Sequence, residues 1–561
     1  MDLVKALLSL LAGIGIFIVG MNMMGNGLEK GAGNGLKKLF AKISNNRFAG
    51  VGIGAGATAI IQSSSATSVM VIGLVNAGVM TLFQAASVIL GANIGTTVTG
   101  LIVALSGTKG PISFSDIAIV LAFVGVMMTF FKKEKVKLIG NIICGLGVIF
   151  VGLGIMSDSL SAKDALGNPT AISTFFEGLF SSMQGFPLLL ILFGAIFTAI
   201  IQSSSAATGI VIVMAGSGVI TVEAALFIVL GSNIGTCVTA LLACIGTGTN
   251  AKRTTFIHFF IKIVGTLIFT AFMWPTGSWL SDLLASTGLN HEFQIALFHV
   301  VFNVINTIML LPFLNPIVKL SELVIKDKEV KAEAYKLKFV DERLLVTPAI
   351  AYEQVRKEIL YMATLANDNV VNSLNEICSP SGRGPEIYEK EATINFTNKA
   401  LTDFLIKLSS EANEDEEKHI GAWFHVINDL ERIGDHAKNF LEISEELTEK
   451  NLALSESAKS EIALMASKVA RMFELAIDVF EIDKADVSSV ASRLAELSTI
   501  EAETDKLKKE YISNHFARLA DGKCDASHSP YYMSTVTRLE RVADHLINVG
   551  YSIVNPTRSQ A

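Results

Sequence analysis

The first 320 residues of this 561-residue chain form long apolar runs separated by short polar segments, whereas the remainder is charged and periodic. Runs of about 20 apolar residues can cross a bilayer as helices. Beyond Lys319, apolar residues recur at helical spacing, without the alternation typical of strands. The pattern predicts an all-α protein, with a polytopic membrane domain followed by a water-soluble helical domain. The apolar segments run near 6–25, 49–76, 83–105, 112–131, 138–156, 188–218, 223–246, 255–274 and 293–314, and the soluble helices near 348–376, 386–412, 417–449, 457–484, 488–518 and 530–554.

Charge divides the chain at the same place. The first 320 residues hold 16 basic and 10 acidic side chains, whereas the rest hold 29 and 42. Basic clusters lie between the apolar segments at 30–47, 132–137 and 252–253. The positive-inside rule places these clusters and the tail in the cytoplasm, which requires segments 49–76 and 188–218 to be re-entrant hairpins. This gives seven crossings and two hairpins, with the N-terminus outside, the C-terminus inside and no cleavable signal peptide.

The two hairpins then enter the membrane from opposite sides. Their tips are expected to approach each other near mid-membrane. Broken helices from two inverted repeats that face one site are typical of alternating-access carriers. We therefore predict two inverted repeats, around 49–156 and 188–314.

Both hairpins carry the same nine residues, TAIIQSSSA, at 58–66 and 198–206. A related element follows each copy, GANIGTT at 91–97 and GSNIGTC at 231–237. A helix that begins at the serines offers free N–H groups to an anion, and the amide and hydroxyl oxygens suit Na+. The alternative is that these small residues only let helices pack closely, which explains a single copy better than two identical ones.

The predicted spans hold few groups that can carry charge, among them Lys262 and Glu223, the latter at a helix start near the rim. An anion in such a neutral cage is disfavoured alone, and bound cations would offset its charge. The sequence therefore favours ion-coupled cotransport. Sparse intramembrane carboxylates speak against protons as the coupling ion.

The paired QSSS, GANIGT and GSNIGT motifs resemble the type II sodium–phosphate cotransporter family over about the first 315 residues. The resemblance implies sodium-coupled movement of inorganic phosphate across the plasma membrane, with Na+ as the coupling ion. Substrate and ions would be bound by Gln62, Ser63, Ser64 and Ser65 with Gln202, Ser203, Ser204 and Ser205, supported by Asn93, Thr96, Asn233 and Thr236.

Relatives of this family often carry a His-x-x-x-Asn segment. It occurs here as His299 to Asn303, whereas the earlier His258 is followed by Lys262 in place of the asparagine. We interpret Lys262 as a side chain that extends to the cytoplasmic rim, in preference to an ion-pathway role, since long basic side chains often do so. His299 is interpreted as a hydrogen-bonded packing residue.

The soluble domain also contains a duplication, two sets of three helices whose third helices read LERIGDH at 430–436 and LERVADH at 539–545. Each carries two carboxylates four residues apart, on one helix face. These helices resemble the PhoU-type phosphate-regulatory domain, whose carboxylates bind metal, so the resemblance implies a divalent or iron-type metal at Glu431, Asp435, Glu540 and Asp544. Weaker companions are Glu391/Asn395 and Glu501/Asp505. A solvated or arginine-paired surface, with Arg432 and Arg541 adjacent, is the alternative.

The domains are expected at 1–318 (membrane), 319–344 (linker) and 345–555 (cytoplasmic, PhoU-like). The predicted function is a sodium-coupled phosphate symporter of the inner membrane, not an enzyme. No motif suggests ATP hydrolysis or nucleic-acid binding. The expected partners are phosphate, sodium and the lipid bilayer, and a homo-oligomer stays open. An exporter, a carrier of another oxyanion, and a non-transporting phosphate sensor remain alternatives.

Overall fold

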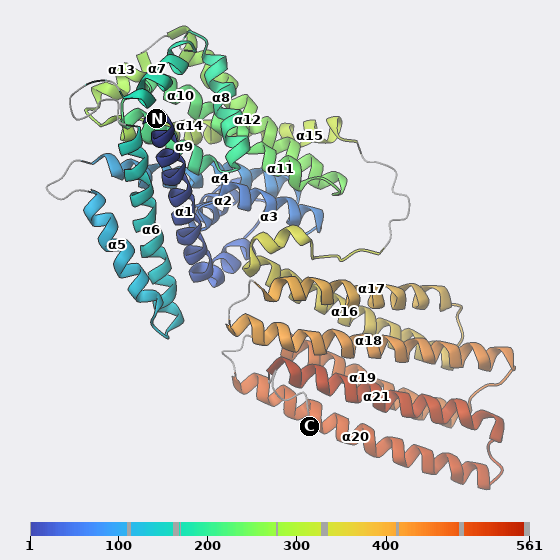
Figure 1. Ribbon diagram of the computed structural model, residues 1–561. Coiled ribbons are helices and arrows are strands. Elements are labelled where there is room, and N and C mark those ends of the chain that lie inside the picture. The colour runs from blue at the N-terminus through green and yellow to red at the C-terminus, as the bar shows by residue number, and fades with distance from the viewer. Residues whose placement is uncertain are drawn as a thin grey trace. The chain divides into compact units, whose positions relative to one another are not determined.

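The computed structural model describes residues 2–108, 114–160, 168, 170–183, 185–276, 279–326, 335–410, 414–481 and 487–554. Parts of five expected elements lie outside these residues: 112–113 of an apolar segment, 327–334 of the linker, 411–412 and 482–484 at the ends of two soluble helices, and 555 at the end of the soluble domain. The chain forms two compact units (Figure 1). One holds the described residues up to 326 together with Asp341–Ile350, and the other holds 335–340 and the chain from Ala351 onward. The described residues contain helices and no strands, so the all-α prediction is confirmed.

Among the described residues of the first unit, six helical stretches are long and apolar enough to span a membrane. The predicted seventh crossing is the shorter α5, which packs along α6 and exposes apolar side chains such as Phe123. The helices are α1 (Asp2–Ala41), α2 (Arg47–Ile61), α3 (Ser64–Asn76), α4 (Leu82–Ala104), α5 (Phe114–Thr129), α6 (Glu134–Ser159), α7 (Ala171–Ser181), α8 (Pro187–Ile201), α9 (Ser204–Gly216), α10 (Val222–Gly235), α11 (Cys237–Ala243), α12 (Thr249–Thr276), α13 (Trp279–Ser286), α14 (His291–Leu310) and α15 (Leu314–Val324). Helices α7, α13 and α15 were not predicted.

Each predicted hairpin is a pair of helices broken at its glutamine. Gln62 ends α2 with φ 58° and ψ 20°, and Gln202 ends α8 with φ 59° and ψ 17°. This left-handed conformation is uncommon outside glycine and costs about 1–3 kcal/mol. The next serine is extended, and a new helix begins. The hairpins α2–α3 and α8–α9 therefore share one backbone geometry.

The glycines of the second motif let two helices of each repeat touch. A Cβ atom on Gly91 of α4 would lie 2.0 Å from the carbonyl oxygen of Val51 in α2. The equivalent Cβ on Gly231 of α10 would lie 1.9 Å from that of Ile191 in α8. Close backbone contact at small residues is how membrane helices gain packing energy. The first helix of each hairpin is thus fixed to the long helix that follows.

The two hairpins open at opposite ends of α4. The chain leaves α3 at Asn76 and enters α4 within a few residues, so Asn76 lies at the start of α4. At the other end, Gly107 accepts a hydrogen bond from Asn290 Nδ2 (2.7 Å), and the next residue, His291, has its Nδ1 3.3 Å from the carbonyl oxygen of Ala215, at the end of α9. The 23 residues of α4 separate these ends by about 35 Å. The repeats are therefore inverted, as predicted.

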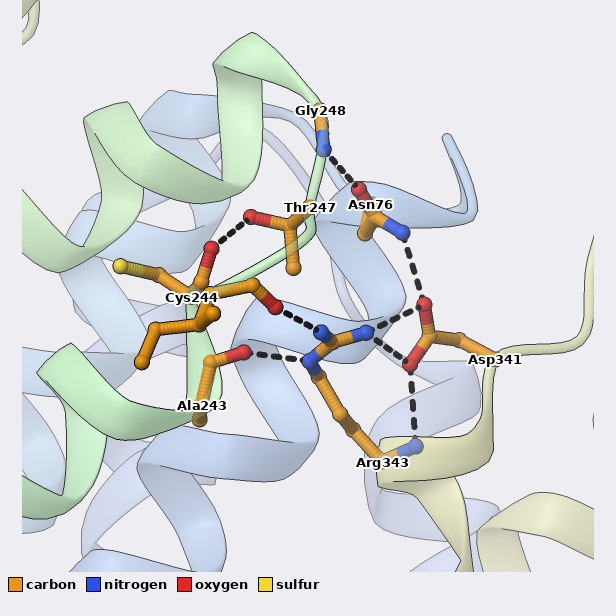
Figure 2. A network of polar contacts seen from close by, with 8 residues as sticks. Asn76, Ala243, Cys244, Thr247, Gly248, Asp341 and Arg343 are labelled. Carbon is orange, nitrogen blue, oxygen red and sulfur yellow. Dashed lines mark hydrogen bonds and ion pairs between the residues drawn. The ribbon is translucent and has the colours of Figure 1, made fainter.

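A segment from the start of the tail, Asp341–Arg343, binds both repeats at the first of these ends (Figure 2), and we call it the clasp. Asn76 donates to Asp341 Oδ2 (2.7 Å) and accepts from the backbone N–H of Gly248 (2.9 Å). Arg343 donates to the carbonyl oxygens of Ala243 and Ile245, just after α11. The clasp thus holds the end of hairpin α2–α3 beside the turn that joins α11 to α12.

The described residues of the second unit form a bundle of six helices in two sets of three, α16–α18 and α19–α21. Helix α18 packs against α21, so the two third helices adjoin, with the rings of His436 and His545 5.7 Å apart. The helices are α16 (Pro348–Cys378), α17 (Gly384–Ser409), α18 (Glu414–Glu449), α19 (Glu456–Glu481), α20 (Val487–Ala520) and α21 (Ser529–Val554). Their number and order agree with the periodicity of the sequence.

Candidate functional site

The QSSS turns form two matching helix N-termini. Ser63 caps α3, its hydroxyl accepting from the N–H of Ala66 (3.1 Å), and Ser203 caps α9 in the same way with Ala206 (3.2 Å). The first N–H groups of a helix lack partners inside the helix and carry a partial positive charge. The next residues, Ser64 and Ser204, are both buried. Each turn therefore presents polar groups suited to an anion.

The two glutamines have different surroundings. Gln62 is buried, and its Oε1 accepts from the hydroxyl of Thr99 on α4 (2.8 Å). Gln202 is exposed. The backbone symmetry of the hairpins therefore does not extend to these side chains. In alternating access, two such sites differ in accessibility within any one conformation.

The asparagines and threonines of the second motif are buried. Thr96 and Thr236 donate to backbone carbonyls of their own helix. The Nδ2 atoms of Asn93 and Asn233 have no partner among the described residues. Helix α4 continues through the first motif, whereas α10 ends at Gly235 and α11 begins at Cys237, so only the second motif interrupts its helix.

Lys262 is deeply buried, which corrects the interpretation that it extends to the rim. It is 2% exposed, and its Nζ donates to Oδ1 of Asn233. Its electrostatic neighbours include Cys237, His258 and His299. The sequence put the side chain within a span, but the facing Asn233 on α10 decides its direction. Lys262 therefore belongs to the interior of the membrane unit, beside the second motif.

A layer of buried polar side chains connects the two repeats. In the first repeat Gln62 binds Thr99, and the adjoining Gly100 lies against the Nδ1 atom of His299 on α14. In the second repeat Thr198 binds Ser232 (2.8 Å), next to Asn233 and its Lys262 contact. Sequence reasoning missed Thr99 and Ser232. Their signal was present, because Ser232 is part of the GSNIGTC element itself and Thr99 lies three residues after Thr96, on the same side of α4.

In the soluble unit, the first pair of predicted metal ligands is bound by arginine. Arg432 lies 3.9 Å from a carboxylate oxygen of Glu431 and 3.6 Å from one of Asp435. Burial and the neighbouring Asp435 raise the pKa of Glu431. The companion Glu391 accepts from Asn395 (2.8 Å). Arginine and amide groups thus occupy part of this first acidic face.

The second set forms a tighter acidic cluster. Glu501, Asp505 and Asp544 have carboxylate oxygens within 4.8 Å of one another, whereas Glu540 binds Lys508 (2.8 Å). Burial, followed by repulsion from neighbouring carboxylates, raises the pKa of both Glu501 and Asp544. A bound cation would relieve this repulsion, and three carboxylates suit a hard divalent ion. The companions Glu501 and Asp505 therefore fit a metal better than Glu540 does.

Comparison with known proteins identifies two families. Residues 16–158 and 168–289 match the family described as Na+/Pi-cotransporter, and residues 359–444 and 462–553 match the PhoU domain. The chain is 25% identical over 483 residues to YjbB of Escherichia coli strain K12, named as a candidate inorganic phosphate export protein, covering 84% of each chain. It is 32% identical over 324 residues to the uncharacterized protein YqeW of Bacillus subtilis strain 168, covering 57% of this chain and 99% of YqeW.

A shorter match, 38% identical over 131 residues, is to the human sodium-dependent phosphate transport protein 2B, covering 23% of this chain and 18% of that protein. No solved structure matches the chain. The matches account for the membrane unit and the soluble unit separately, and the YjbB match extends over most of both chains. The chain is therefore a multi-pass membrane protein that belongs to the Na+/Pi-cotransporter family and carries a C-terminal PhoU domain.

Proposed function

We propose that this protein moves inorganic phosphate across the plasma membrane together with Na+, by alternating access at the two QSSS turns. The observation that carries the proposal is the pair of serine-capped helix N-termini at inverted positions, on Ser63 and Ser203. Helix N-termini bind phosphate through free N–H groups and the helix dipole. Two such helix ends on inverted hairpins would bind one phosphate between them and expose it alternately to the two sides of the membrane.

Sodium binding in this proposal uses the oxygen atoms around the turns. The proposed substrate and ion ligands are Gln62, Ser63, Ser64, Ser65, Asn93, Thr96, Gln202, Ser203, Ser204, Ser205, Asn233 and Thr236. Carbonyl, amide and hydroxyl oxygens are the ligands that hard cations such as Na+ prefer. Cations bound there would offset the charge of phosphate, which makes its passage through the buried layer depend on their gradient.

Net phosphate export is the second candidate, because YjbB is described as an export protein and the human relative as sodium-dependent. An ion-coupled carrier runs in either direction according to its gradients. The two candidates therefore share one site and differ in the driving force that operates in the cell.

Radiolabelled phosphate flux in proteoliposomes tests the proposal. An inward Na+ gradient should accelerate uptake, and reversing the gradient should accelerate release. Double replacement Ser64→Ala and Ser204→Ala should lower flux at least about tenfold, since each loss removes a buried hydroxyl near the anion. The control is Ser87→Ala, whose buried hydroxyl only donates to the carbonyl oxygen of Gln84 in its own helix. Phosphate flux that does not depend on Na+ would refute the coupling. Phosphate binding without flux would indicate a sensor.

The soluble unit is proposed to lie in the cytoplasm and to regulate flux. Basic residues support this side, because Lys252 and Arg253 begin α12 beside the turn that the clasp binds. We retain membrane domain 1–318, linker 319–344 and PhoU-like domain 345–555 as proposed boundaries. The clasp lies within that linker and belongs to the compact membrane unit, so a change in the attached domain would reach both repeats through it.

A further inference from the structure

The membrane unit contains two equivalent helix pairs, which show what is unusual about Lys262. Thr307 of α14 donates to the carbonyl oxygen of Leu90 in α4 (3.2 Å), and Thr266 of α12 donates to that of Leu230 in α10 (3.3 Å). Leu90 and Leu230 are related by the internal repeat, 140 residues apart. Helix α14 therefore packs against α4 in the same way as α12 packs against α10.

This equivalence aligns His299 with His258, and Asn303 with Lys262, because each pair has the same separation along the chain as Thr307 and Thr266. In α14, Asn303 lies one turn from Thr307 and one turn from His299, which contacts α4 at Gly100. It therefore lies at the level of the first motif in α4. Lys262 occupies the corresponding level of α12, beside the second motif.

The two positions differ in the side-chain group that each places beside its motif. In the second pair, the Lys262 ammonium donates to Oδ1 of Asn233. In the first pair, Asn303 donates to the carbonyl oxygen of His299 (2.9 Å), and its own Oδ1 has no partner among the described residues although Asn303 is 1% exposed. One half thus has a cationic nitrogen where the other half has a free, buried acceptor oxygen.

A buried ammonium needs a compensating negative charge, since an uncompensated charge in the interior is strongly destabilising. Among the described residues, Cys237, His258 and His299 interact electrostatically with Lys262, and the hydrogen-bond acceptor of its ammonium is the neutral amide oxygen of Asn233. An anion bound by the second hairpin, which contacts α10 through Thr198 and Ser232 next to Asn233, would supply that charge. Phosphate, as a dianion, suits an ammonium as a point-charge partner.

We propose that Lys262 is a built-in cation that replaces one coupling Na+ in the second half of the carrier. The first half keeps the free oxygen of Asn303 as part of a Na+ site. The protein would then carry one Na+ fewer per phosphate than a carrier with asparagine at both positions. This inference rests on the proposed sodium-coupled transport and adds the residue that sets its stoichiometry.

Reciprocal substitutions test the inference in proteoliposomes, with 22Na and 32P fluxes measured together. Lys262→Asn makes the second half resemble the first, and it should raise the Na+ to phosphate flux ratio by one. Asn303→Lys makes the opposite change and should lower the ratio by one. The control Thr270→Val alters a buried side chain two turns along α12 from Lys262 and should leave the ratio unchanged. Ratios equal to wild type in both charge variants would overturn the proposal.

A second measurement separates this inference from the proposed function and covers variants that fold poorly. Lys262→Arg keeps the charge and Lys262→Met removes it. The thermal unfolding temperature of each variant, compared with that of the wild type, shows whether the variant is folded. Met should raise the phosphate KM at least tenfold, whereas Arg should stay within about threefold of wild type. Equal phosphate KM values for Met and Arg would overturn the charge role. If wild-type flux does not depend on Na+ but Lys262→Met still raises the phosphate KM, the proposed sodium coupling is wrong, whereas the role of the Lys262 charge in phosphate binding is supported.

Discussion

At the scale of single residues, the turns depend on glutamines held in a left-handed backbone conformation. Gln62 and Gln202 share this conformation, yet only Gln62 has a hydrogen bond to the long helix of its repeat. The backbone strain is offset where the side chain makes a specific contact. The hydroxyl of Thr99 therefore contributes both to the shape of the first turn and to the polarity of the layer below it.

Replacing Thr99 by valine tests that contact. The change leaves Gln62 Oε1 buried without its donor, which costs about 1–3 kcal/mol. We expect the phosphate KM to rise about tenfold with a modest loss of thermal stability. Thr97→Val is the matched control on α4, because its hydroxyl donates only to the carbonyl oxygen of Ile94 in the same helix (2.7 Å). Equal effects of the two variants on KM would count against a role for Thr99 at the site.

The acidic cluster of α20 and α21 gives a prediction about pH. Because the pKa values of Glu501 and Asp544 are raised in the folded state, the metal-free protein loses stability as pH rises above their ordinary values of 4.5 and 3.8. Mn2+ should therefore raise the thermal unfolding temperature at pH 7, where the carboxylates are charged, and much less at pH 5, where protons compete with the metal.

Asp505→Asn should abolish the Mn2+ shift, since it removes one carboxylate of the cluster. Glu510→Gln, an exposed position on the same helix, should leave the shift intact. Differential scanning fluorimetry with the full-length protein in detergent measures both variants. An unchanged shift in Asp505→Asn would assign the bound metal to another place.

At the scale of helices, close backbone contact explains the glycines of both repeats. Gly231→Ala would place its Cβ 1.9 Å from the carbonyl oxygen of Ile191, so α8 and α10 would have to separate. We expect the variant to unfold at a temperature several degrees lower, or to aggregate on extraction. Gly52→Ala on α2 has no atom within 4 Å and should behave as wild type. A fully stable Gly231→Ala protein would show that this contact is not tight.

The clasp gives a second prediction about helices. Arg343→Ala removes the donors to the carbonyl oxygens that follow α11, and we expect faster amide hydrogen exchange around Ala243–Thr247. Arg356→Ala is the matched control, because Arg356 donates to the carbonyl oxygens of Phe480 and Glu481 at the end of α19 in the other unit. It should accelerate exchange there and leave 243–247 unchanged. Unchanged exchange in Arg343→Ala would show that the clasp does not stabilise this turn.

At the scale of the whole molecule, inversion of the repeats implies a two-sided arrangement. The turn after α3 and the turn after α9 lie at opposite ends of α4. In a cysteine-depleted background, Ala77→Cys should therefore be labelled by an impermeant maleimide only from the cytoplasm, and Ser217→Cys only from outside. A reference variant whose single cysteine is Cys524, in the soluble unit, should be labelled from the same side as Ala77→Cys. Labelling of both engineered sites from one side would contradict the inverted arrangement.

Features that depend on local composition could be predicted from the amino-acid sequence. Apolar run length gave the spanning segments, periodicity gave the six helices of the soluble unit, and the duplicated TAIIQSSSA marked both hairpins. The helix break at each glutamine followed because polar residues in an apolar segment need partners or an ion. These properties lie within a few turns of chain, so neighbouring residues were enough to indicate them.

Which helices face one another could be learned only from the folded chain. It placed α12 against α10, so Lys262 meets Asn233 inside the unit rather than extending to the rim. It brought the clasp to Asn76, 265 residues away in the chain, and favoured Glu501 and Asp505 over Glu540 in the acidic cluster. The physical reason is that the direction of a long side chain is fixed by partners on other helices, and no local pattern encodes which helix supplies them.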